Sequence, residues 1–164
     1  CELKGKKVET EAIEPEMNLQ ISAFLPDTYI PNTDQRLIAY KRLATTTEGP
    51  EVDDLKKEWR DRYGQLPESA RDLILLAKIR LMLKRIGIVR IDGEDESFCL
   101  YYGKETSLRL FASFLERIKC AFTIVAERKL RVDVWGRDLT HRLVRLKRIL
   151  HDFSGHATDI KSLQ

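Results

Sequence analysis

The sequence predicts an α+β domain, because two different hydrophobic periods follow one another along the chain. Before residue 87 apolar residues recur with the spacing of amphipathic helices, and after it short stretches alternate with a period of two. Of the 164 residues, 43% are hydrophobic, which is typical of a folded domain. We expect an N-terminal extended strap and three helices, followed by a small, mainly antiparallel sheet with two further helices.

The N-terminal part predicts a linker, a strap and a first helix. Residues 1–17 are charged and lack a period, so we expect a linker from a preceding domain. The stretch NLQISAFLP over 18–26 predicts a short strand, and the prolines around it favour an extended strap. Asn32 and Gln35 resemble a capping box for a helix over 33–45.

Two more helices are expected before the period changes. The first runs over 51–63 and ends at Gly64. The next starts after Pro67 and ends at Gly87, and its Leu and Ile residues on more than one side predict a buried, central helix.

The remaining elements make up the sheet and its helices. They are strands over 88–92 and 97–103, a helix capped by Thr106, a hairpin of 121–126 with 130–135, and a basic amphipathic helix over 137–153. We expect 154–164 to be a flexible tail, so that a single domain spans 18–153. The residues expected in the core are Leu37, Leu55, Trp59, Leu73, Leu76, Ala77, Phe111, Phe114, Val132, Val134, Leu143 and Leu146.

No pattern for catalysis, a cofactor or a metal is present. The glycines form neither a G-x-G-x-x-G nor a Walker A loop, and no histidine has metal-ligand spacing. Three cysteines without a C-x-x-C favour a reducing cytoplasm over a disulfide framework or a zinc site. No apolar run approaches the length of a membrane span. We therefore expect a cytoplasmic, non-enzymatic chain without cofactors. Because it begins with Cys, we interpret it as part of a longer protein and not as a stand-alone scaffold.

The helix over 51–63 carries an acidic stripe near its end. At about 100° per residue, Asp54, Glu58 and Asp61 fall within roughly 60° of one another, while Trp59 lies on the opposite, core-facing side. One interpretation is a solvated face with helix ion pairs such as Glu58 with Arg62. The other is a contact surface for a partner that carries arginine, because an arginine fork relieves the repulsion between two acids one turn apart.

A basic segment over 128–148 supports a second hypothesis. It holds eight Lys/Arg and only two acidic residues, and Arg137, Arg142, Arg145 and Arg148 could contact phosphates of a nucleic acid. Stacking aromatics are sparse there, so an ordinary amphipathic surface helix is the alternative.

Two blocks of the sequence resemble one known family. The first holds Glu14-Pro15-Glu16, Asn18-Leu19, Tyr29-Ile30-Pro31, Arg36-Leu37 and Tyr40-Lys41-Arg42; the second holds Glu58-x-x-Asp61-Arg62-Tyr63-Gly64, Leu66-Pro67 and Ile86-Gly87-Ile88. Over about residues 14–90 the chain closely resembles the C-terminal domain of bacterial transcription-repair coupling factors, and beyond 90 only the order of elements is similar.

The resemblance implies a regulatory role in transcription-coupled nucleotide excision repair. The parent would be an ATP-dependent, helicase-type DNA translocase with ATP and magnesium in its motor domain, binding double-stranded DNA, stalled RNA polymerase and the repair protein UvrA. The C-terminal domain would dock on the N-terminal UvrA-binding module of the same chain, mask its UvrA surface and restrain the motor. The resemblance assigns the contact with that module to Glu58 and Asp61, and the helical wheel adds Asp54.

Overall fold

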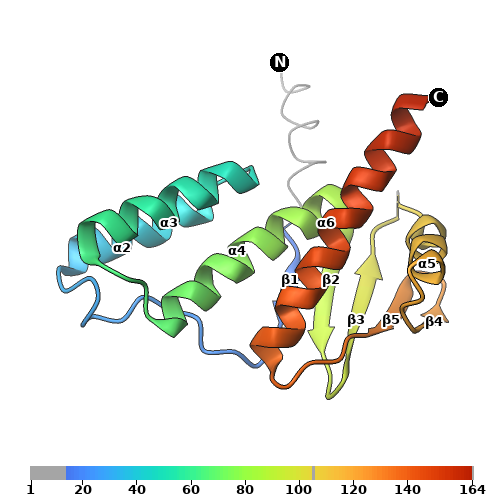
Figure 1. Cartoon of the computed structure of the whole chain (residues 1–164), viewed down its shortest axis with the longest axis horizontal. Helices are drawn as coiled ribbons and strands as arrows, with labels where there is room; N and C mark the ends of the chain where they lie inside the picture. Colours follow the sequence, from blue (N-terminus) through green and yellow to red (C-terminus); the bar gives the residue numbers. More distant parts are fainter. Residues whose placement is uncertain (1–13, 105, 164) are drawn as a thin grey trace.

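The computed structural model describes residues 14–104 and 106–163, and its helices and strands form an α+β fold (Figure 1). The elements follow in the order β1 (Glu16–Asn18), α2 (Thr33–Ala44), α3 (Gly49–Tyr63), α4 (Glu68–Ile86), β2 (Ile88–Gly93), β3 (Ser97–Tyr102), α5 (Leu108–Arg117), β4 (Phe122–Ala126), β5 (Lys129–Asp133) and α6 (Leu139–Leu163). The five strands form one sheet in the order β1-β2-β3-β5-β4, with β1 parallel to β2 and the other neighbours antiparallel. The predicted fold class is confirmed.

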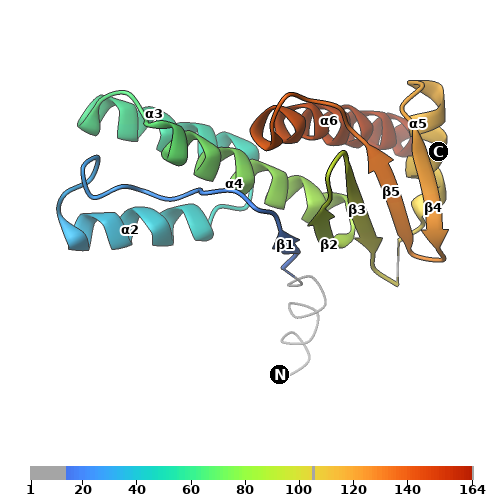
Figure 2. The same cartoon turned by 90° about the horizontal axis from the view of Figure 1, so that it is seen from below.

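Two hydrophobic cores lie side by side, and α4 belongs to both. Its Ala70, Ile74 and Ala77 pack with α2, α3 and the strap over residues 19–31, whereas Ile79 and Leu83 pack with the sheet, α5 and α6. Figure 2 shows the strap running beside α4 to β1. The prediction that this helix is central is confirmed.

The helix ends follow from local sequence signals. The side chain of Asn32 accepts a hydrogen bond of 2.9 Å from the backbone N–H of Gln35, as the predicted cap requires. Helix α3 begins at Gly49, two residues before the predicted start at Glu51, because the Glu51 carboxylate accepts the backbone N–H groups that precede the helix, at 2.6 Å and 3.0 Å. Gly87 ends α4 with φ 93°, where a Cβ atom would meet the Thr106 side chain.

Four further expectations about the fold differ from the structure, the first being the cap of α5, which is Ser107 and not Thr106. Leu37 is 61% exposed, so its place in the predicted core is wrong: α2 packs through Ala39 and Leu43, and Leu37 points about 160° away from Ala39 on the helix. The strand expected over 18–26 is instead β1 at Glu16–Asn18, because the chain leaves the edge of β2 after Asn18 and follows the helical half as a strap. Helix α6 continues to Leu163, into the expected tail, because no proline stops it at Phe153.

The expected linker over 1–17 lies mainly outside the described residues. Glu14, within the expected linker, forms ion pairs with Arg80 and Lys84 of α4 at 3.2 Å and 2.9 Å. The division of the chain at residues 18 and 153 stays a prediction.

Candidate functional site

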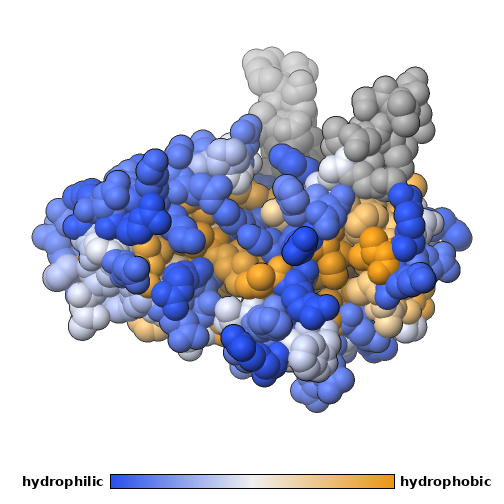
Figure 3. Space-filling view, viewed as in Figure 1, coloured by the Kyte–Doolittle hydropathy of each residue, from blue (hydrophilic) through white to orange (hydrophobic). Residues whose placement is uncertain are grey.

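Helix α3 turns one face to the core and its acidic residues outward. Leu55 and Trp59 are buried, and Trp59 is only 1% exposed. Asp54 and Asp61 are exposed, and Glu58 is partly exposed. Hydrophilic side chains dominate this part of the surface (Figure 3). The predicted assignment of the two faces of this helix is confirmed.

Glu58 is held by an arginine of the neighbouring helix. Its Oε2 and Oε1 accept hydrogen bonds of 2.7 Å and 3.0 Å from Nη1 and Nη2 of Arg42 in α2. Arg62 lies farther away, with Nη1 3.6 Å from Oε2. The hydrogen bond from Arg42 is the main cause that lowers the pKa of the Glu58 carboxyl below its ordinary value. Glu58 is therefore a fixed carboxylate that already binds one guanidinium in a two-pronged geometry.

The helical wheel predicts Arg62 as a neighbour of Glu58 but misses Arg42. A hint of this contact is present in the sequence, because two consecutive helices joined by a short connection usually pack antiparallel. In such a hairpin the C-terminal part of α2 lies beside α3, and the long Arg42 side chain reaches Glu58 in the second half of α3. The pairing depends on how the two helices are rotated, and a single helical wheel does not contain that information.

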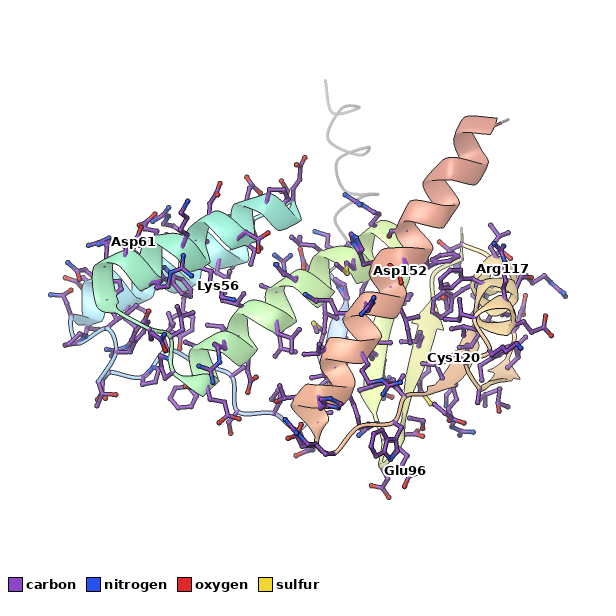
Figure 4. All side chains as sticks on the ribbon, viewed as in Figure 1. Lys56, Asp61, Glu96, Arg117, Cys120 and Asp152 are labelled. Carbon is purple, nitrogen blue, oxygen red and sulfur yellow. The ribbon has the colours of Figure 1, made fainter. Side chains whose placement is uncertain are left out.

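Asp61 and Asp54 flank Glu58 on the same side of α3. Asp61 lies at the outer edge of the helical half (Figure 4) and makes no ion pair with the described residues. Asp54 lines a small hollow between the end of α2 and α3 together with Arg42. The acidic residue that ties α3 to α4 is Asp53, through an ion pair with Lys78. Of the three acids in the stripe, Glu58 forms an ion pair, whereas Asp54 and Asp61 form none with the described residues.

An exposed isoleucine of α2 completes this surface. The Tyr63 hydroxyl contacts Gln35 at 3.3 Å, and Arg42 contacts Glu58, so these two contacts bracket Ile38. Ile38 is 56% exposed and lies level with Asp61 on the antiparallel helix. We call Ile38, Asp54, Glu58 and Asp61 the α2–α3 acidic surface. The sequence does not single out Ile38, because only the packed hairpin shows that it is uncovered.

The strap fixes the end of α3 that carries these acids. The Tyr29 hydroxyl lies 2.8 Å from the carbonyl oxygen of Gly64, and the Tyr29 and Tyr63 rings meet edge to face at 5.7 Å. The backbone N–H of Leu25 donates to the Tyr40 hydroxyl at 2.7 Å, which joins the strap to α2 as well. The acidic surface is therefore presented on rigid elements, as a specific contact requires.

The four arginines expected to contact phosphates do not form one surface. Arg142 is 7% exposed and donates to the carbonyl oxygens of Val134, Glu94 and Ser97 at 2.8–3.0 Å. It is a structural residue, so its expected role as a phosphate contact is wrong. Arg137 precedes α6 in a loop, and only Arg145 and Arg148 lie together as exposed residues of α6.

Within the described ranges, 14–104 and 106–163, no three His, Cys, Asp or Glu side chains gather as a metal site would need. In the same ranges no helix has the length and apolar character that a membrane span requires. Cys99 is buried and Cys120 partly buried, and both are free thiols whose pKa is raised by burial.

Comparison with known proteins assigns this arrangement to one family. The structure superposes on a crystal structure described as the C-terminal domain of transcription-repair coupling factor, with a TM-score of 0.73 and 21% identity, over 87% of this chain and 95% of that one. The fold is therefore that of such a domain. The sequence model of the TRCF domain matches residues 19–112, and the chain belongs to this family.

Full-length relatives are much longer than this chain. The transcription-repair-coupling factor of Haemophilus influenzae is 37% identical over 80 residues, which are 49% of this chain and 7% of that protein. The Escherichia coli protein is 32% identical over 92 residues, 56% of this chain and 8% of that protein. The Myxococcus xanthus protein is 26% identical over 160 residues, 94% of this chain and 13% of that protein. The similarity thus extends beyond residue 90, where the sequence alone indicated only the order of elements.

Proposed function

We propose that this chain is the regulatory C-terminal domain of a transcription-repair coupling factor, and that its α2–α3 acidic surface docks on the N-terminal UvrA-binding module of the same protein. Docking masks the UvrA-binding surface and restrains the ATP-dependent DNA translocase. Engagement of stalled RNA polymerase on damaged DNA opens the contact in the cytoplasm. ATP and magnesium belong to the motor domain of the parent, and no catalysis is assigned to this chain.

The geometry of Glu58 is the observation that carries the proposal. An ionised carboxylate has about four lone-pair sites, and Arg42 uses two of them. The remaining sites can accept a second guanidinium from outside. Asp61, one turn further along and without an ion pair among the described residues, supplies the next carboxylate. An arginine of the partner can therefore bridge Glu58 and Asp61 without breaking the bond to Arg42.

The surface has the composition of a reversible contact. Ile38 supplies an apolar centre that loses water on docking, and the acids around it supply orientation and specificity. Contacts between domains of one chain are modest in area and polar, which suits a switch between docked and released states. Whatever binds the released state preferentially, such as DNA or polymerase, shifts the equilibrium and uncovers the UvrA site.

Calorimetric titration of this chain with the N-terminal module of the same protein tests the proposal. Replacing both acids, as Glu58→Ala with Asp61→Ala, should weaken binding by about 2–5 kcal/mol, roughly thirtyfold or more. The matched control is Asp95→Ala with Glu96→Ala, which removes the same charge from an exposed hairpin remote from α3. Equal binding by the Glu58/Asp61 variant and the native chain, or no binding at hundreds of micromolar, contradicts the proposal.

A further inference from the structure

A second surface lies on the side of α3 that faces α4. There the first turn of α3, the C-terminal half of α4 and the middle of α6 enclose a groove of about 960 Å³. Six Lys or Arg side chains line it, against two acidic ones, Glu48 and Asp53. The whole chain has a net charge of only +3, so this groove concentrates positive charge that the overall composition conceals.

Most of the positive charge in the groove is available to a partner. Lys78 is paired with Asp53, and Lys84 with Glu14. Arg85, Arg145 and Arg148 make no ion pair with any described residue. Each of these three can therefore donate to an incoming anion without first breaking an ion pair.

Lys147 also lines the groove and makes no ion pair with a described residue. Burial is the main cause that lowers the pKa of its ammonium group, and the positive charges of Lys78 and Lys56 lower that pKa further, while Asp53 acts in the opposite sense. Lys56 extends from the side of α3 that faces α4 (Figure 4). An incoming carboxylate would offset the repulsion between these ammonium groups.

The floor of the groove is apolar. Leu81 and Met82 of α4 are partly buried there, and Val144 of α6, which also lines the groove, is 46% exposed. Figure 3 shows hydrophobic side chains at the surface between α3 and α6, with hydrophilic ones on both sides. Methionine adapts its shape to different apolar partners, which suits a binding floor.

We propose that this groove binds an acidic amphipathic helix of a partner protein. Its apolar face would cover Leu81, Met82 and Val144, and its carboxylates would pair with Arg85, Arg145 and Arg148. Such a helix-in-groove contact needs both features that are found here, an apolar floor and a charged rim.

The same features disfavour a nucleic acid as the occupant. A phosphate backbone gains nothing from an apolar floor, whereas the apolar face of an amphipathic helix is removed from water there. Arg142, the remaining cation of this part of α6, is committed to backbone carbonyls. The inference is independent of the role proposed for Glu58, which lies on the α2 side of α3.

Selection from a displayed library of helical 18-residue peptides tests this inference, with the chain immobilised. We expect selected peptides to carry Asp or Glu three or four residues from Leu, Phe or Met, along one helix face. A synthesised copy of a selected peptide should bind the variant Arg145→Glu with Arg148→Glu at least tenfold more weakly than the native chain. The control variant Arg109→Glu with Arg128→Glu changes the net charge equally at exposed positions on α5 and a turn, and it should bind normally.

Two further measurements distinguish the groove from the α2–α3 acidic surface and from a nucleic-acid site. The variant Glu58→Ala with Asp61→Ala should bind the selected peptide as the native chain does, whatever it does to docking of the N-terminal module. An 18-base-pair DNA duplex should neither displace the peptide at equimolar concentration nor bind more tightly. A selection without acidic residues, equal binding by the Arg145/Arg148 variant, or tighter binding of the duplex overturns the inference.

Discussion

The guanidinium group of Arg142 lies over the ring of Phe98, 4.7 Å from its centre, and joins α6 to the centre of the sheet. The same group donates to the carbonyl oxygens of Val134, Glu94 and Ser97, at the point where β5 ends and the β2–β3 connection turns. A cation that the sequence places in a basic patch thus acts inside the fold, where it closes the sheet against the first turn of α6.

Replacing Arg142 by Ala should therefore destabilise the domain. Buried carbonyl groups lose their donors and Phe98 loses its cation, so we expect the free energy of unfolding to fall by about 3 kcal/mol or more. Urea denaturation followed by circular dichroism measures this change. Arg145→Ala, three residues along and exposed, serves as the control and should stay within about 0.5 kcal/mol of the native chain. Equal effects of the two substitutions would contradict the structural role.

The two tryptophans should respond in opposite ways to truncation. Trp59 is 1% exposed and Trp135 is 69% exposed. Trp59→Ala opens a large cavity in the helical core and should cost about 3–5 kcal/mol of unfolding free energy. Trp135→Ala should be nearly neutral in the same denaturation experiment. A small loss for Trp59→Ala would contradict the assignment of the core-facing side of α3.

Two leucines of α2 provide a second matched pair. Leu43 is 5% exposed in the helical core, and Leu37 is 61% exposed on the far side of the helix. We expect Leu43→Ala to lower the free energy of unfolding by about 2–5 kcal/mol, and Leu37→Ala to change it by about 0.5 kcal/mol at most. Thermal unfolding monitored by circular dichroism distinguishes the two. A large loss of unfolding free energy for Leu37→Ala would show that Leu37 is buried in the core after all.

The substitution Ile38→Ala should affect docking without affecting stability. Because it is 56% exposed, Ile38→Ala should leave the unfolding midpoint almost unchanged. If Ile38 is the apolar centre of the docked surface, the same substitution should weaken binding of the N-terminal module about tenfold, by loss of the buried side chain. Leu110→Ala on α5, 58% exposed, is the control for a general loss of surface hydrophobicity. Unchanged docking by Ile38→Ala would restrict the contact to the acids.

The Arg42–Glu58 contact should give stability a specific dependence on pH. The pKa of Glu58 is lowered from its ordinary value of 4.5, mainly by the hydrogen bond from Arg42, so the folded state binds this proton less readily than the unfolded state. The stabilisation is therefore complete above the ordinary pKa and is lost as pH falls through the lowered one. The difference in unfolding midpoint between the native chain and Glu58→Gln should shrink as the pH falls from neutral to about 3.

The variant Arg42→Ala provides the reference for that experiment. Without the guanidinium, the substitution Glu58→Gln should have an effect on the unfolding midpoint that changes much less with pH. A pH-dependent difference of the same size in both backgrounds would show that another group causes it. Because Glu58 is partly exposed, high salt should reduce the effect in the native background.

The sequence was sufficient wherever one element determines the outcome by itself. The period of α3 placed Trp59 inside and Asp61 outside, and Gly64 and Gly87 ended their helices as predicted. It was insufficient where two elements meet. Leu37 is exposed, and Glu58 is bound by Arg42, because of the rotation of α2 against α3.

The basic segment also shows what the sequence cannot predict, namely which of its arginines are buried. Charge density alone cannot distinguish Arg142, whose neighbours are carbonyl oxygens of distant strands, from Arg145, which faces solvent. The groove between α3, α4 and α6 is also invisible in the sequence, since its lining comes from three stretches of the chain.

Helix α4, which belongs to both cores, has a mechanical consequence. Its 19 residues extend for about 28 Å, with one end packed among α2, α3 and the strap and the other against the sheet. Helix α4 therefore connects the two halves rigidly, and the strap, whose residues contact both cores, forms a second connection. A force applied to the acidic surface is therefore expected to reach the sheet through α4, so that the two halves move as one body.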